Sequence, residues 1–71
     1  MPIDLNEAEV IVNWKKDRLG SFYTALMDAV TKADSENLDR LEAAYPVHVN
    51  AWRNFKSTPG WWGEVEGRFM R

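Results

Sequence analysis

The sequence predicts an all-α protein, a compact bundle of four or five short helices that forms a single domain over residues 1–71. Three observations predict it. Apolar residues recur every three or four positions along most of the chain, and capping residues, glycines and prolines separate these runs. No segment shows a convincing strand pattern. A chain of 71 residues has room for one domain only.

The first predicted helix starts after Asp4, whose carboxylate can cap the first turn, and Glu7 lies three residues on and can reach back. It is expected to run to about Lys16. Gly20 then ends it, and Ser21 is available as the next cap. Two apolar lines share this helix: Ala8, Ile11 and Val12, and beside them Val10 and Trp14.

Residues 22–33 carry the clearest helical pattern. Six residues fall at the spacing of one buried stripe, and Tyr23 and Met27 widen it to one side. The stripe consists of Phe22, Ala25, Leu26, Ala29, Val30 and Ala33. Asp34 can then cap a new helix that carries Leu38 and Leu41, although one long helix through Asp34 is an alternative.

Pro46 disfavours a helical residue before it and suits the first position of the next helix. That helix carries a stripe of Val49, Trp52 and Phe55. A turn at residues 58–60 follows, and residues 61–69 have helical spacing despite Gly63 and Gly67, which each cost about 1 kcal/mol relative to Ala. Residues 59–71 are therefore expected either to complete the core or to form a semi-independent aromatic segment.

Composition excludes several kinds of function. The chain has no cysteine, so disulfides and thiolate metal sites are excluded, and a single histidine excludes any site that needs two imidazoles. No apolar run approaches a membrane span, and the N-terminus does not resemble a secretory signal. We therefore expect a cytoplasmic protein without membrane association.

Candidate catalytic groups are sparse. His48 has no carboxylate within four residues and is expected to be an exposed or capping side chain. The acidic residues between 34 and 42 lack the spacing of a calcium loop and are expected to form a solvated helix face. No glycine pattern suits a bound phosphate. The chain is therefore not expected to be an enzyme or to bind a cofactor or metal.

The C-terminal region combines aromatic and basic side chains, which dominate many protein–protein contacts and can also stack on nucleic-acid bases. Neighbouring residues on a helix point about 100° apart, so Trp61 and Trp62 are not both expected to face inward. Either of them is a candidate contact. The candidate partner-binding residues are Trp61, Trp62, Phe69, Arg53, Lys56 and Arg68.

The chain also contains four short motifs: the helical stretch of residues 22–29, Ala-Asp-Ser-Glu-Asn-Leu at residues 33–38, Tyr45-Pro46, and Pro59-Gly60-Trp61-Trp62. With these motifs, residues 20–62 resemble a group of small uncharacterised helical proteins of bacterial and phage genomes. The resemblance implies a prokaryotic or mobile-element origin. It implies no activity and transfers no functional residue.

These observations predict a non-catalytic accessory or regulatory module that binds another protein or itself, with a homodimer as one form. The alternative is nucleic-acid binding, through the C-terminal cations or a helix–turn–helix around residues 33–37. Charge weighs against this alternative. Residues 4–42 carry nine acidic and five basic side chains, whereas residues 43–71 carry two acidic and four basic ones.

Overall fold

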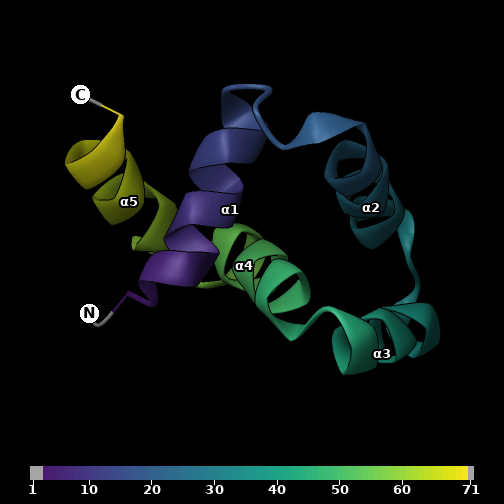
Figure 1. The fold of residues 1–71 in the computed structure, drawn as a ribbon. Helices are drawn as coiled ribbons and strands as arrows, with labels where there is room; N and C mark the ends of the chain where they lie inside the picture. Colours follow the sequence, from purple (N-terminus) through teal and green to yellow (C-terminus); the bar gives the residue numbers. More distant parts are fainter. Residues whose placement is uncertain (1–2, 71) are drawn as a thin grey trace.

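A computed structural model describes residues 3–70 and shows five helices and no strand in that range (Figure 1). The predicted all-α fold is confirmed. The helices are α1 (Leu5–Lys15), α2 (Gly20–Lys32), α3 (Ser35–Ala44), α4 (Pro46–Ser57) and α5 (Trp61–Phe69).

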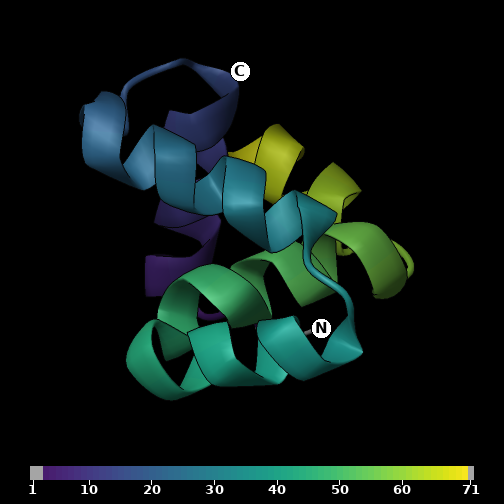
Figure 2. The same ribbon diagram turned by 90° about the vertical axis from the view of Figure 1, so that its right-hand side faces the viewer.

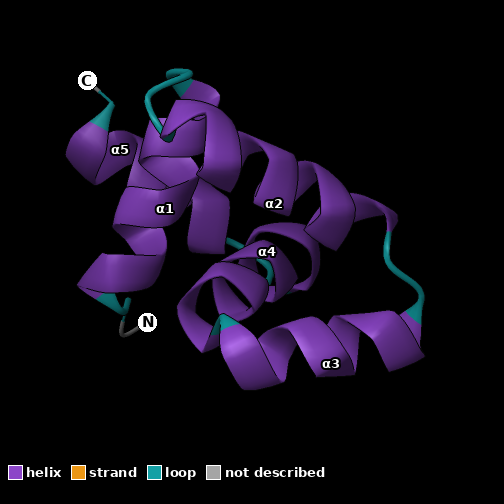
Figure 3. Cartoon of the chain, turned by 45° about the vertical axis from the view of Figure 1, so that its right-hand side comes forward, coloured by secondary structure: helices purple, strands orange, loops and turns teal. Residues whose placement is uncertain are grey.

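Helix α4 is the centre of the arrangement, because α1, α2, α3 and α5 all pack against it. Figure 2 and Figure 3 show α4 between α2 and α3. Helix α5 returns to the other side of the molecule and packs on both α1 and α4. The last helix therefore shares its packing with the first.

Aspartate caps define two helix starts, as predicted. The Asp4 carboxylate accepts hydrogen bonds from the backbone N–H groups of Asn6 (2.8 Å) and Glu7 (3.2 Å). Asp34 accepts one from the N–H of Asn37 (2.8 Å), so α2 and α3 are separate helices and the single long helix is wrong. Pro46 is the first residue of α4.

The predicted boundary at Gly20 is wrong, because Asp17 ends α1. Asp17 adopts a left-handed conformation with φ 55°. Its N–H donates to Trp14 O, and the N–H of Arg18 donates to Asn13 O, the pair of bonds that closes a helix with a left-handed residue after its end. Gly20, with φ 82°, instead opens α2, and Ser21 forms no cap.

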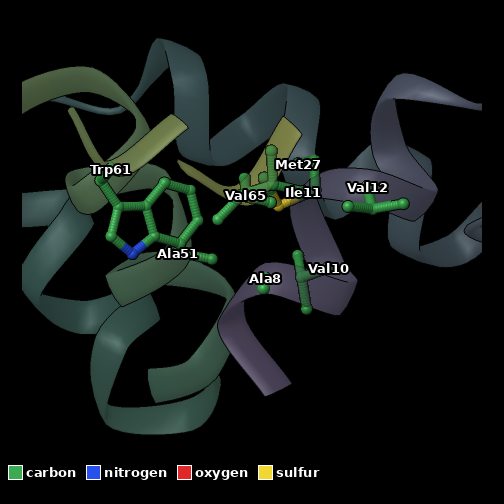
Figure 4. Close-up of a cluster of buried hydrophobic side chains, with 8 residues drawn as sticks. All are labelled: Ala8, Val10, Ile11, Val12, Met27, Ala51, Trp61 and Val65. Carbon is green, nitrogen blue, oxygen red and sulfur yellow. The ribbon is translucent and has the colours of Figure 1, made fainter. Parts of the chain in front are cut away.

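Two groups of buried side chains form the core. The larger one joins α1, α2, α4 and α5 (Figure 4), and the smaller one joins α2 and α4, with partly buried side chains of α3 around it. Helix α4 contributes Ala51 to the larger group and Val49 to the smaller, while Trp52 packs against both. The larger group consists of Ala8, Val10, Ile11, Val12, Met27, Ala51, Trp61 and Val65.

Only two of the six residues in the predicted buried stripe of α2 are buried, and Ala33 is half-buried. Leu26 and Val30 are buried, and Met27 joins them, but Phe22, Ala25 and Ala29 are exposed. The reason is geometric. The predicted stripe is wider than the part of α2 that α4 covers. The side of α2 that is buried is centred between Val30 and Met27, not on the middle of the predicted stripe.

We expect Trp61→Ala to lower the free energy of unfolding by about 3–5 kcal/mol, because it removes the largest fully buried side chain of the core. The matched control is Trp62→Ala, which truncates a half-buried neighbour of the same type. Urea denaturation followed by circular dichroism measures both. Equal losses for the two variants would contradict the assignment of Trp61 as the core residue.

Candidate interaction surfaces

The two adjacent tryptophans have different environments. Trp61 is 2% exposed and lies in the larger core group (Figure 4), whereas Trp62 is half-buried at its edge. Gly60, which precedes them at the start of α5, adopts a left-handed conformation with φ 80°. The expectation that the two do not both face inward is confirmed, and Trp61 is not accessible to a partner.

Trp62 belongs to a row of partly buried aromatic rings along α1, α4 and α5. Its ring meets Phe55 edge-on with centroids 5.3 Å apart, and Phe55 also contacts Trp52 and Trp14 at 5.9 Å each. The ammonium of Lys15 lies 4.8 Å from the Phe55 centroid. Because these rings contact one another, this row is a seam between helices rather than an open stacking surface.

The predicted cations do not form one basic patch. Arg53 donates to Glu42 (2.5 Å) and Asp39 (3.0 Å) of α3, and the bond to Glu42 is the main cause that raises its pKa. Arg68 pairs with Glu64 one turn earlier on α5 (2.7 Å). Lys56 is exposed and forms no ion pair with residues 3–70. Two of the three predicted cations are thus neutralised within the fold.

An exposed apolar groove lies between α1 and α5. Leu5 is 64% exposed and Phe69 is 41% exposed, and together with Glu9 and Val12 they line a hollow of about 370 Å³. We call these four residues the α1–α5 groove. Of the three aromatic side chains predicted as contacts, Phe69 alone is exposed, and it lines this groove.

A second exposed apolar surface lies on α2. Phe22 is 58% exposed, and Ala25 and Ala29 are exposed on the same side of the helix. We call these three residues the α2 outer face. Next to it, α2 and α3 enclose a cleft of about 390 Å³, here called the α2–α3 cleft, which is lined by Ala29, Lys32, Ala33, Asn37, Arg40 and Leu41.

The sequence indicated that His48 would be an exposed or capping side chain. In the structure, α4 has no side-chain cap, and His48 is half-buried. Its ring stacks on Tyr23 with centroids 4.9 Å apart and planes 7° apart, and burial lowers its pKa. Both rings line a hollow of about 380 Å³ that also contains Glu9. Among the described residues, no hydrogen bond joins His48 to that carboxylate, and no serine or threonine lines the hollow. That the chain is not an enzyme stays a prediction.

Residues 3–70 contain neither a cluster of metal-ligating side chains nor a helix suited to a membrane. No group of three histidine, aspartate or glutamate side chains is placed to hold a metal ion. No helix in this part of the chain has the length and apolar character needed to cross a bilayer.

Sequence reasoning missed Leu5 and Phe22 as exposed apolar residues. A weak signal existed for Phe22, because Tyr23 follows it directly and adjacent helical residues point about 100° apart, so two bulky neighbours are harder to cover with one partner helix. No sequence signal marked Leu5 as exposed.

We expect a nuclear magnetic resonance titration of the lone histidine to give a pKa below its ordinary value of 6.5, because partial burial disfavours the imidazolium. The unfolded chain then binds the proton more readily, so stability is full above 6.5 and falls as the pH drops from 6.5 toward the folded pKa. His48→Gln should flatten this loss. A pKa at or above 6.5 would contradict the assignment.

Comparison of the chain with models of protein families, with curated proteins and with solved structures found no match. Proposals about its function therefore depend on the geometry of the surfaces described above.

Proposed function

We propose that this chain is a small non-catalytic module that binds another protein through the α1–α5 groove. The observation that carries the proposal is the exposure of Leu5 and Phe69 on the two sides of one apolar hollow. Large apolar side chains that stay in water and flank a concave surface are typical of partner-binding sites. Phe69 retains its predicted role here, while Trp61 does not.

The groove suits an amphipathic helix of the partner. Its walls are two helices, and a third helix can lay apolar side chains spaced three or four residues apart between them. Glu9 is exposed, lines the groove and forms no ion pair among the described residues. A lysine or arginine beside the apolar residues of the partner would complement it.

Nucleic-acid binding is supported less well. Such binding depends on cations that are free to replace the counterions of phosphates. Arg53 and Arg68 are held by Asp39, Glu42 and Glu64. The aromatic row that would stack on bases is also engaged in ring–ring contacts.

The sequence supports a proposal about the origin and cellular location of this module. Its resemblance to small helical proteins of bacterial and phage genomes supports a prokaryotic or mobile-element origin, and the absence of cysteine supports a cytoplasmic, reducing environment. An accessory or regulatory role fits a chain that offers a docking groove and little chemistry of its own.

We expect Phe69→Ser to abolish capture of a specific protein from a bacterial lysate by the immobilised chain, with the captured protein identified by mass spectrometry. With that protein purified, calorimetry should show at least about a tenfold loss of affinity, because an aromatic anchor is removed from the contact.

Two controls sharpen this experiment. Phe22→Ser makes the same exchange on the α2 outer face and should leave the capture unchanged. Thermal melts should show that both variants stay folded, since both side chains are exposed. If Phe69→Ser retains the captured protein at full affinity, the groove is not the binding site. Salt-sensitive binding of single-stranded DNA would favour the alternative function.

A further inference from the structure

We propose that the hollow between α1, α2 and α4 is a binding site for an alkylammonium group, that is, a primary amine cation on a short aliphatic chain. This is the hollow that contains Glu9, Tyr23 and His48, and we call it the α1–α4 hollow. The inference goes beyond the proposed function, because it concerns a second site and names the chemical class of its ligand. Around the axis of α1, Glu9 lies between the residues that line the groove and those that line the hollow.

Three helices line the α1–α4 hollow. Helices α1 and α2 both pack on α4, and the hollow lies between them. Helix α4 contributes Val47 and His48, and α2 contributes Tyr23. The volume of about 380 Å³ lies within the range of about 300–1,000 Å³ that is usual for small-molecule sites. A ligand in this hollow therefore contacts three helices at once.

Helix α1 contributes a line of oxygen acceptors to the hollow. Asn6, Glu9 and Asn13 are three and four residues apart, so their side chains share one face of the helix. Each has a side-chain oxygen that can accept a hydrogen bond. No hydrogen bond or ion pair among residues 3–70 uses any of these three side chains. An ammonium group has three N–H donors and no acceptor, which suits this set of oxygens.

The charge of the hollow also favours a cation. Glu9 is the one charged side chain that lines it near neutral pH, because burial lowers the pKa of His48 and keeps the imidazole neutral. Lys16 and Arg18 are close in sequence, but neither lines the hollow or forms an ion pair with Glu9. Residues 4–42, which include α1 and α2, carry nine acidic and five basic side chains, so their wider field attracts cations as well.

The remaining lining suits an aliphatic chain and distinguishes an organic cation from a metal ion. Val10, Leu19 and Val47 line the hollow and can contact methylene groups. The Tyr23 ring is 41% exposed, and an aromatic ring attracts a cation placed over it. A metal ion gains nothing from apolar side chains, and calcium takes six to eight oxygen ligands, whereas this hollow offers one carboxylate.

A nuclear magnetic resonance titration of the isotope-labelled full chain with butylammonium chloride, near neutral pH, tests the proposal. We expect saturable shifts of the Asn6, Glu9 and Asn13 amides and of the His48 ring. The dissociation constant should be on the order of millimolar, because so small a ligand with one ion pair binds weakly. Glu9→Gln should raise this constant about fivefold. The matched control is Glu66→Gln, which removes the same charge from an exposed position on α5 and should leave binding unchanged.

Two further ligands separate the charge from the aliphatic chain. Butanol has the same chain without the charge and should bind at least about fivefold more weakly. Ammonium chloride has the charge without the chain and should give no saturable shifts at these residues. Tyr23→Leu should also weaken butylammonium binding, because it removes the aromatic ring but keeps an apolar side chain. Thermal melts show whether each variant stays folded.

An alkylammonium group has two natural sources, a free amine and the lysine side chain of another protein. Titrations with putrescine and with N-acetyl-lysine methylamide distinguish them. Tighter binding of putrescine identifies a small-molecule site, whereas tighter binding of the lysine derivative identifies a protein ligand. Either result supports the same chemistry in the hollow.

Four results would overturn the proposal: butylammonium shifts that do not saturate, a Glu9→Gln variant that binds as well as the natural chain, butanol that binds as tightly as butylammonium, or magnesium chloride that shifts the same residues more strongly. The proposed groove is tested separately. Tyr23 does not line the groove and Phe69 does not line the hollow. Tyr23→Leu should therefore leave protein capture unchanged, and Phe69→Ser should leave amine binding unchanged, so the two proposals fail independently.

Discussion

Helix α4 can support all four other helices because its side chains divide between two cores. Ala51 and Val49 are both fully buried, one in each group, and Trp52 spans the ridge between them. The alanine matters as much as the larger residues. A side chain without atoms beyond Cβ lets α1 approach closely, and any larger residue there would have to displace a tightly packed neighbour.

The smaller core group depends on polar links as well as on apolar contact. Helix α3 has no fully buried residue, and it is held by partial burial of Leu38 and Leu41 and by the two bonds from Arg53 to Asp39 and Glu42. Exposed ion pairs stabilise only modestly. Partial burial against α4 therefore supplies most of what holds α3 in place.

Local chemistry explains why most helix boundaries could be predicted from the sequence. A capping aspartate accepts from N–H groups two or three residues later, and a proline fixes the backbone of the first helical turn. Both effects act within a few residues. Asp4, Asp34 and Pro46 therefore have the roles that their positions indicate. Asp17 does not follow this pattern, because glycine is the usual residue at a left-handed helix end and Gly20 was only three residues away.

The surfaces could be predicted less well, because periodicity tells which residues share a face but not how much of that face a neighbour covers. Leu26 and Phe22 lie on one stripe of α2, yet only Leu26 is buried. The rotation of α5 similarly decides which of Trp61 and Trp62 is buried. The partners of Arg53 lie 11 and 14 residues away, too far for a spacing rule to identify them.

The packing of the last helix on the first has a consequence for the order of folding. Trp61 and Val65 of α5 lie in the same core group as Ala8 and Ile11 of α1. Contacts between residues so far apart in the sequence form only after the intervening chain has closed into a loop, which costs conformational entropy. The larger core group therefore cannot be completed on the ribosome until α5 has been synthesised, whereas the smaller group of α2 and α4 can form earlier.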